Sequence, residues 1–124
     1  MKILLDTHAL IKWMEDKAPR RLIRELAKEQ TLVAVSILTP WEIALKPELG
    51  FRPAQVEDAI EKIGASLLPI NLTHIAKFAA LPSLREHRDP FDRMLIAQAL
   101  SDGHTLASRD QRFELYPGLN VIWD

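Results

Sequence analysis

The feature that most constrains the fold is the segment HRDPFDR at residues 87–93, together with the apolar run that follows it. Asp89 suits the N-cap of a helix, and Pro90 suits the first helical position because the N–H that proline lacks would be unpaired there. Gly103 is typical of a helix end. The helix between them is apolar on nearly every side, so we predict that it is buried although its first turn carries Asp89 and Asp92.

The rest of the chain alternates short apolar runs, typical of buried strands, with segments whose apolar residues recur at helical spacing. Predicted strands cover residues 2–5, 32–35, 66–70, 104–108 and 120–123. Predicted helices begin near residue 7, cover 20–29, 40–46 and 53–63, follow a cap at Asn71 or Thr73, and cover 90–102. This order predicts one α/β domain over residues 1–124, a three-layer sandwich around a mostly parallel sheet of four to five strands.

Composition excludes several classes of function. Sixteen Lys and Arg against seventeen Asp and Glu give a net charge of −1, so any binding to nucleic acid must be local. No cysteine is present, which excludes disulfides and thiolate metal sites. No apolar run is long enough for a signal peptide or a membrane span, so we expect a cytoplasmic protein without a membrane.

Two tetrads have the same order of a cap, a proline, an aromatic residue and an acid. They are Thr39-Pro40-Trp41-Glu42 and Asp89-Pro90-Phe91-Asp92. In each, the acid at the predicted third helical position could reach back to the N-cap N–H as part of a capping box. A metal site is the other explanation, and either tetrad alone fits both.

The predicted topology brings four acids together. Asp6 and Asp110 end strands, whereas Glu42 and Asp92 begin helices. In a parallel α/β sheet the strand carboxyl ends and the following helix amino ends share one edge, where ligands bind. Clustered carboxylates repel one another and stay ionised only with a cation. Oxygen ligands without cysteine favour Mg²⁺ or Mn²⁺.

Four motifs at these positions resemble the PIN-domain nucleases, and within them the toxin ribonucleases of bacterial VapBC toxin–antitoxin pairs. The motifs are LLDTHAL at 4–10, Ser36 with WEIA at 41–44, RDPFDR at 88–93 with LIAQA at 95–99, and SRD at 108–110. The resemblance spans the chain. It implies an acidic quartet of Asp6, Glu42, Asp92 and Asp110, with Mg²⁺ or Mn²⁺, an RNA substrate, a homodimer and a cognate antitoxin that blocks the site.

The mechanism that this resemblance implies is metal-assisted hydrolysis of a phosphodiester bond. Asp6, Asp92 and Asp110 are the candidate metal ligands, and Glu42 would bind directly or through water. Thr7 and Ser108 would orient water or ligands, or else make local hydrogen bonds.

Basic residues beside the motifs have two possible roles. They could contact phosphates or neutralise the acid cluster; these residues are Lys46, Arg88, Arg93 and Arg109. The sequence Lys46-Pro47 departs from relatives whose helix continues past the lysine, which leaves the placement of Lys46 open. His8 and His87 are possible proton carriers that a metal mechanism does not need.

Three aromatic residues, Trp13, Trp41 and Phe91, could stack on RNA bases, but their helical spacing favours packing in the core.

The sequence leaves three alternative functions. One is an RNA-processing PIN nuclease without an antitoxin. A Mg²⁺-binding receiver domain would need paired acids after the first strand and an acid after the third, whereas here the third ends at Ile70-Asn71. A non-catalytic binding module would have no reason to keep four acids.

Overall fold

A fully parallel sheet of five strands forms the centre of the molecule in the computed structural model, which describes residues 1–124. The strands pair in the order β3-β2-β1-β4-β5. Their bounds are β1 Lys2–Leu5, β2 Leu32–Ser36, β3 Ser66–Leu68, β4 Thr105–Ala107 and β5 Val121–Ile122. The α/β class and the predicted number and direction of strands are therefore confirmed.

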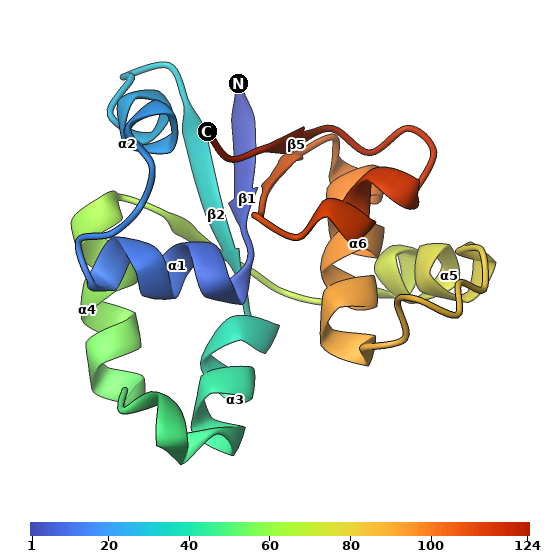
Figure 1. The fold of residues 1–124 in the computed structure, drawn as a ribbon, viewed down its shortest axis with the longest axis horizontal. Helices are drawn as coiled ribbons and strands as arrows, with labels where there is room; N and C mark the ends of the chain where they lie inside the picture. Colours follow the sequence, from blue (N-terminus) through green and yellow to red (C-terminus); the bar gives the residue numbers. More distant parts are fainter.

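Six α-helices and two 3₁₀ helices connect the strands. Figure 1 shows how the α-helices lie around the sheet. The α-helices are α1 Thr7–Met14, α2 Arg20–Leu26, α3 Leu38–Leu45, α4 Pro53–Ile63, α5 Leu72–Ala80 and α6 Pro90–Asp102. The 3₁₀ helices are η1 Pro47–Leu49 and η2 Gln111–Leu115. No helix is long and apolar enough to cross a membrane.

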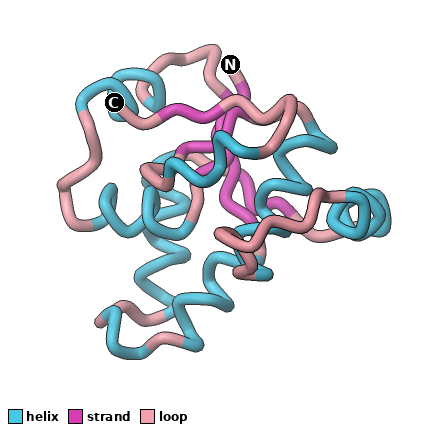
Figure 2. The backbone as a smooth tube through the Cα atoms, turned by 45° about the vertical axis from the view of Figure 1, so that its right-hand side comes forward, coloured by secondary structure: helices cyan, strands magenta, loops and turns pink.

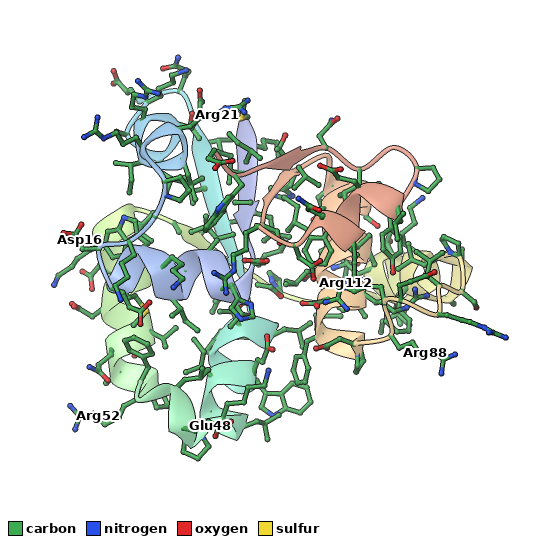
Figure 3. All side chains as sticks on the ribbon, viewed as in Figure 1. Asp16, Arg21, Glu48, Arg52, Arg88 and Arg112 are labelled. Atoms are coloured by element: carbon green, nitrogen blue, oxygen red, sulfur yellow. The ribbon has the colours of Figure 1, made fainter.

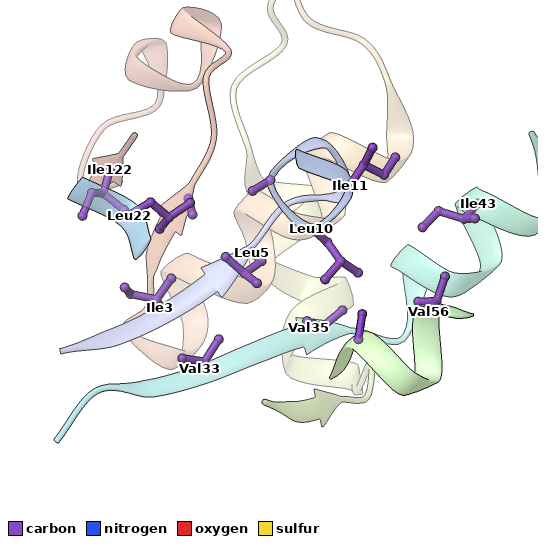
Figure 4. Close-up of a cluster of buried hydrophobic side chains, with 13 residues drawn as sticks. Ile3, Leu5, Leu10, Ile11, Leu22, Val33, Val35, Ile43, Val56 and Ile122 are labelled. Atoms are coloured by element: carbon purple, nitrogen blue, oxygen red, sulfur yellow. The ribbon is translucent and has the colours of Figure 1, made fainter. Parts of the chain in front are cut away.

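The sheet separates two apolar layers because successive side chains of a strand point to opposite faces. Ile3, Leu5, Val33 and Val35 face a layer that contains α1, α2 and α4 (Figure 4). Leu4 points to the other face, together with the side chains of Ala34 and Leu106, and packs against α6. Figure 2 shows the strands between helices on both sides, which is the predicted three-layer arrangement.

Helix α6 is buried as its composition predicted. Leu95, Ile96, Ala97 and Ala99 are each at most 1% exposed, and the helix ends at Gly103 in a left-handed conformation. Because the apolar residues surround the helix axis, one face contacts the sheet while others contact α5 and η2. The first turn of α6 is thereby held at the carboxyl edge of the sheet.

The start of α3 corrects one prediction. The helix begins at Leu38, so Thr39 is not its N-cap and Glu42 lies in the second turn rather than at the third position. Ser36 explains the earlier start, because its Oγ accepts the N–H of Leu38 at 3.2 Å. Pro40 is accommodated because the first N–H groups of a helix have no intrahelical partner. A capping box at Glu42 is therefore excluded, and the two tetrads have different local structures.

Several elements are shorter than predicted. Helix α2 ends at Leu26 instead of residue 29, because residues 28–30 are exposed and have no apolar side chain to pack. Strand β3 ends at Leu68, before Pro69, which has no N–H to donate. Strands β4 and β5 are each one residue shorter at both ends than predicted. Asp6 still follows the end of β1 directly, and Ser108 follows β4, so the shorter strands leave Asp6 and Asp110 at the carboxyl edge of the sheet.

Candidate active site

Three of the four predicted acids line one cleft at the carboxyl edge of the sheet. Asp6, Asp92 and Asp110 border a space of about 560 Å³, with Ser108 and Arg112 among the other lining residues. One oxygen of Asp92, one of Asp110 and one ring nitrogen of His87 lie within 4.8 Å of one another. The cleft therefore concentrates carboxylate oxygens from the end of β1, the start of α6 and the segment after β4.

Asp6 is the most buried of the three acids, at 4% exposure. It caps α1, since its Oδ1 accepts the N–H of Ala9 at 2.7 Å, and it also receives a hydrogen bond from Ser108. Burial raises the pKa of Asp6 from 3.8 to about 7; the hydrogen bonds partly oppose this rise and the charges of Asp92 and Glu42 add to it. The protein alone thus leaves the charge of this carboxylate poorly compensated at neutral pH.

Asp89 and Asp92 divide the two roles that the sequence left open. Asp89 is the N-cap of α6, because its Oδ1 accepts the N–H of Phe91 at 2.8 Å. Asp92 lies at the third helical position, as predicted, but its Oδ2 is 3.2 Å from Nε2 of His87. Burial and the charge of Asp89 raise the pKa of Asp92, whereas the contact with His87 lowers it.

Asp110 has a cationic partner, Arg112, that is absent from the basic residues predicted for the site. Arg112 contacts both carboxylate oxygens, with Nε at 3.0 Å from Oδ1 and Nη2 at 2.7 Å from Oδ2. These hydrogen bonds hold the pKa of Asp110 below its ordinary value. The same guanidinium donates to the carbonyl of Glu86 at 2.9 Å, which anchors it to the connection before α6.

Glu42 lies behind the cleft, buried at 4% exposure. Thr7 donates its hydroxyl hydrogen to Oε1 at 2.5 Å, so the hydroxyl of Thr39, 3.3 Å from that of Thr7, must donate to Thr7. Lys46 donates to Oε2 at 2.8 Å, and this bond raises the pKa of Lys46. The position of Lys46 is thereby settled: Pro47 ends α3 after it, yet its ammonium group reaches Glu42.

The remaining basic candidates differ in their surroundings. Arg93 is half-buried and donates to the carbonyl of Pro82 and to the hydroxyl of Tyr116, both at 2.9 Å. Arg88 and Arg109 are exposed and make no ion pair or side-chain hydrogen bond. Figure 3 shows Arg88 near the edge of the molecule and Arg112 closer to its centre. Arg88 and Arg109 are therefore the ones available to an external anion.

His87 is buried at 1% exposure and contacts the site directly through Asp92. A metal mechanism gives this residue no necessary role, and no sequence motif points to Tyr116, whose hydroxyl is 2.9 Å from Nδ1 of His87. The only local feature of the sequence that placed His87 near the site was its position two residues before Asp89, the N-cap of α6. His8, the other candidate, is exposed in the same cleft.

Trp41 contradicts the prediction of core packing, because 57% of it is exposed. Its ring lies edge-on to Phe91, with centroids 5.2 Å apart. Both rings border an apolar groove of about 360 Å³ between α3, α5 and the start of α6, whose other lining residues are Leu38, Ile70, Ile75, Phe78, Pro90 and Met94. Trp13, in contrast, packs against the core as predicted.

The sequence matches the PIN domain family over residues 3–119, which is nearly the whole chain. The chain belongs to the PIN domain family. Members of this family are nucleases, so the resemblance to PIN-domain nucleases is confirmed and the receiver-domain alternative is excluded. No curated protein matches the sequence.

Solved structures of VapBC and FitAB proteins bound to DNA have the same fold. VapBC2 from Rickettsia felis, bound to a DNA fragment from its promoter, has a TM-score of 0.77 at 16% identity, with all of both chains covered. DNA-bound VapBC from Salmonella typhimurium has a TM-score of 0.73 at 20% identity, covering 98% of this PIN-domain chain and 97% of that one. FitAB bound to a DNA fragment has a TM-score of 0.67 at 22% identity, covering 97% of this chain and 93% of that one. At 16–22% sequence identity, the similarity to these structures shows a shared fold and no more.

Proposed function

We propose that this PIN-domain protein is a divalent-metal-dependent endoribonuclease and the toxin of a toxin–antitoxin pair. The observation that carries the proposal is the convergence of Asp6, Asp92 and Asp110 on one cleft of a chain in a nuclease family. The three acids come from positions far apart in the sequence, and capping explains only part of their contacts: Asp6 and Asp110 accept backbone N–H groups, but Asp92 contacts a side chain.

The donor set of the cleft fits Mg²⁺ or Mn²⁺. Both ions prefer oxygen ligands, and the cleft offers carboxylates without any thiolate. The raised pKa of Asp6 supports the same conclusion, because a buried carboxylate near two other acids gains most from a bound cation. In this proposal Asp6, Asp92 and Asp110 hold the metal.

Hydrolysis needs an activated water and a neutralised leaving group. A bound divalent ion supplies both, by lowering the pKa of a water and by balancing charge on the scissile phosphate. Ser108 lies between two of the acids: its hydrogen bond to Asp6 lowers the pKa of that carboxyl, and its Oγ accepts the N–H of Asp110 at 3.0 Å. Glu42, buried behind the cleft and anchored by Thr7 and Lys46, contributes through water or by its charge rather than by direct contact.

The substrate in this proposal is RNA, which follows from the resemblance to VapBC toxin ribonucleases. Its phosphates would contact exposed arginines around the cleft. Arg109 lines the acid cleft, whereas Arg85 and Arg88 line an adjacent hollow of about 560 Å³. Arg93 supports the protein structure instead, because its donors are engaged by Pro82 and Tyr116. An RNA toxin would act in the cytoplasm.

The proposed partners are a cognate antitoxin and a second copy of the chain. The antitoxin is supported by solved relatives of the same fold, among them a toxin–antitoxin complex from Klebsiella pneumoniae with a TM-score of 0.64 at 20% identity, covering 97% of this chain and 95% of that one. The homodimer is supported by the apolar groove beside Trp41, since large exposed apolar surfaces mark interfaces. An RNA-processing nuclease without an antitoxin is the alternative.

A cleavage assay with purified protein tests the enzymatic part. We expect RNA cleavage with Mg²⁺ or Mn²⁺, none with EDTA, and none for Asp6→Asn, which keeps the shape of the side chain but removes its charge. Either metal should also raise the melting temperature, because it binds only the folded state. Unchanged melting and unchanged activity in millimolar metal would exclude the proposed site.

The toxin role needs a separate test. Co-expression with the product of a small reading frame immediately upstream should yield a co-purifying complex that no longer cleaves RNA. If no such neighbour exists and expression leaves growth unaffected while cleavage persists, the RNA-processing alternative holds.

A further inference from the structure

The hydroxyl of Tyr116 lies between two nitrogen atoms inside the protein. Nη1 of Arg93 and Nδ1 of His87 are each 2.9 Å from it, and the tyrosine is only 2% exposed. A guanidinium has donors and no acceptor, so Arg93 must donate to the tyrosine oxygen. The hydroxyl hydrogen of Tyr116 then has one acceptor in reach, which is Nδ1 of His87.

This direction determines which nitrogen of His87 carries a hydrogen. Because Nδ1 accepts from Tyr116, the ring hydrogen is on Nε2, the nitrogen that faces Oδ2 of Asp92 at 3.2 Å. Four groups therefore form a chain of hydrogen bonds with one direction: Arg93 to Tyr116, Tyr116 to His87, and His87 to Asp92. The chain ends on a carboxylate that lines the acid cleft.

Packing holds the chain in this arrangement. The His87 ring lies edge-on between Phe113, at 5.0 Å between centroids, and Tyr116, at 5.5 Å. Arg93 is fixed by its second bond, to the carbonyl of Pro82. The imidazole is therefore unable to rotate toward the cleft without displacing buried aromatic rings.

The same geometry argues against His87 as a metal ligand, although one of its ring nitrogens lies within 4.8 Å of an oxygen of Asp92 and an oxygen of Asp110. A ligating nitrogen needs a free lone pair. The lone pair of Nδ1 is engaged by Tyr116, and Nε2 carries its hydrogen.

We propose that His87 is a positioning residue: it donates to Oδ2 of Asp92, and Tyr116 and Arg93 fix the tautomer that allows this. One oxygen of Asp92 is thereby committed to the protein and the other is presented to the cleft. The consequence for metal binding rests on the proposed metal-dependent function, whereas the tautomer is a property of the metal-free protein.

The tautomer is measured directly by long-range ¹⁵N–¹H correlation spectra of the metal-free protein, with the His87 signals assigned from their loss in His87→Gln. We expect hydrogen on Nε2 and an unprotonated Nδ1. Tyr116→Phe, which keeps the ring, should shift the Nδ1 signal by removing its donor. Hydrogen on Nδ1, or an Nδ1 signal unaffected by Tyr116→Phe, would overturn the proposal.

The positioning role is measured as affinity for Mn²⁺ alone, by calorimetry. His87→Leu should weaken binding roughly 10- to 100-fold, the usual effect of losing a group that orients a metal ligand. His87→Gln, whose amide offers an N–H donor, should restore most of it. Equal losses in the two variants would overturn the proposal, because they would mean that the imidazole itself is required.

The chain provides a matched control in His74. It is also fully buried, its Nδ1 accepts the N–H of Asn71 at 3.2 Å, and its Nε2 is 3.0 Å from Asp102, at the other end of α6. His74→Leu should lower the melting temperature without weakening Mn²⁺ binding, which separates positioning from stability. If wild type binds no Mn²⁺, the proposed function fails while the spectra still decide the tautomer.

Discussion

Asp89 and Asp92 lie three residues apart in the first turn of α6 and have different partners. Asp89 accepts a backbone N–H of its own helix at 2.8 Å, whereas Asp92 contacts the side chain of His87 at 3.2 Å. One acid therefore stabilises the helix start, and the other belongs to the cleft.

Substituting these two acids should have opposite effects. Asp89→Ala should lower the free energy of unfolding by about 0.5–2 kcal/mol, the usual cost of losing a cap. Asp92→Asn should leave the metal-free protein as stable or more stable, because it removes one of several crowded carboxylates, but should abolish metal-induced stabilisation and cleavage. Melting curves with and without Mg²⁺ measure both. A stable Asp89→Ala that no longer responds to metal would reverse the assignment.

The raised pKa of Asp6 predicts a pH dependence of stability in EDTA. Between its ordinary pKa of 3.8 and its folded pKa of about 7, the folded state holds a proton that the unfolded state has lost. The contribution of Asp6 is therefore full below pH 3.8 and declines as the pH rises through 7.

Other groups also titrate, so the quantity to measure is the difference in unfolding free energy between wild type and Asp6→Asn. This difference should fall from pH 4 to pH 7, that is, over the interval between the two pKa values. Mg²⁺ binding should strengthen over the same interval, because the metal needs the ionised carboxylate. A difference that is independent of pH would contradict the assignment of a raised pKa.

The sequence predicted the parts of the site that depend on local chemistry and on sheet topology. Asp89 and Gly103 bound α6 as their residue types required. Asp6 and Asp110 follow β1 and β4, which are neighbours in the parallel sheet, so their convergence followed from the strand pattern.

The sequence did not predict contacts that depend on three-dimensional packing. His87 and Tyr116 are 29 residues apart and meet only because the chain after η2 returns to the start of α6, where Tyr116 also contacts Arg93. Arg112 faces Asp110 because a 3₁₀ turn follows β4, whereas the motif itself pointed to the neighbouring Arg109. Trp41 has the spacing of a core residue, yet the space beside it is a surface groove.

Arg112 should compete with a cation for Asp110. Arg112→Gln removes the hydrogen bonds that lower the pKa of Asp110, so this pKa should rise toward its ordinary value. Metal affinity should rise roughly two- to fivefold, the effect expected for an exposed ion pair. Calorimetry with Mn²⁺ measures the affinity.

Arg109→Gln serves as the control, because it removes the same charge from the same cleft without a partner. If only Arg112→Gln tightens binding, the competition is specific. Weaker binding in Arg112→Gln would show instead that Arg112 holds Asp110 in place for the metal.

Thr7 should stabilise the protein through Glu42. Thr7→Val removes the hydroxyl that donates to Oε1 at 2.5 Å and should cost about 1–3 kcal/mol, the penalty for leaving a buried acceptor unsatisfied. Thr7→Ser keeps the donor and should cost clearly less. Urea unfolding of the two variants provides the comparison, and equal losses would assign the role of Thr7 to its methyl group.

Trp41 should anchor the proposed homodimer. It is 57% exposed, it contacts Phe91, and it borders an apolar groove on the same side of the molecule as the first turn of α6. Trp41→Glu places a charge on this groove and should raise the dissociation constant of the dimer roughly 30-fold or more, since loss of a central aromatic anchor costs about 2 kcal/mol.

Leu115→Glu is the matched control, because Leu115 is 51% exposed on η2, away from the groove. Sedimentation over a concentration series should show a monomer for Trp41→Glu where wild type and Leu115→Glu are dimers. A monomeric wild type would refute the homodimer, and dissociation by Leu115→Glu alone would move the interface to η2.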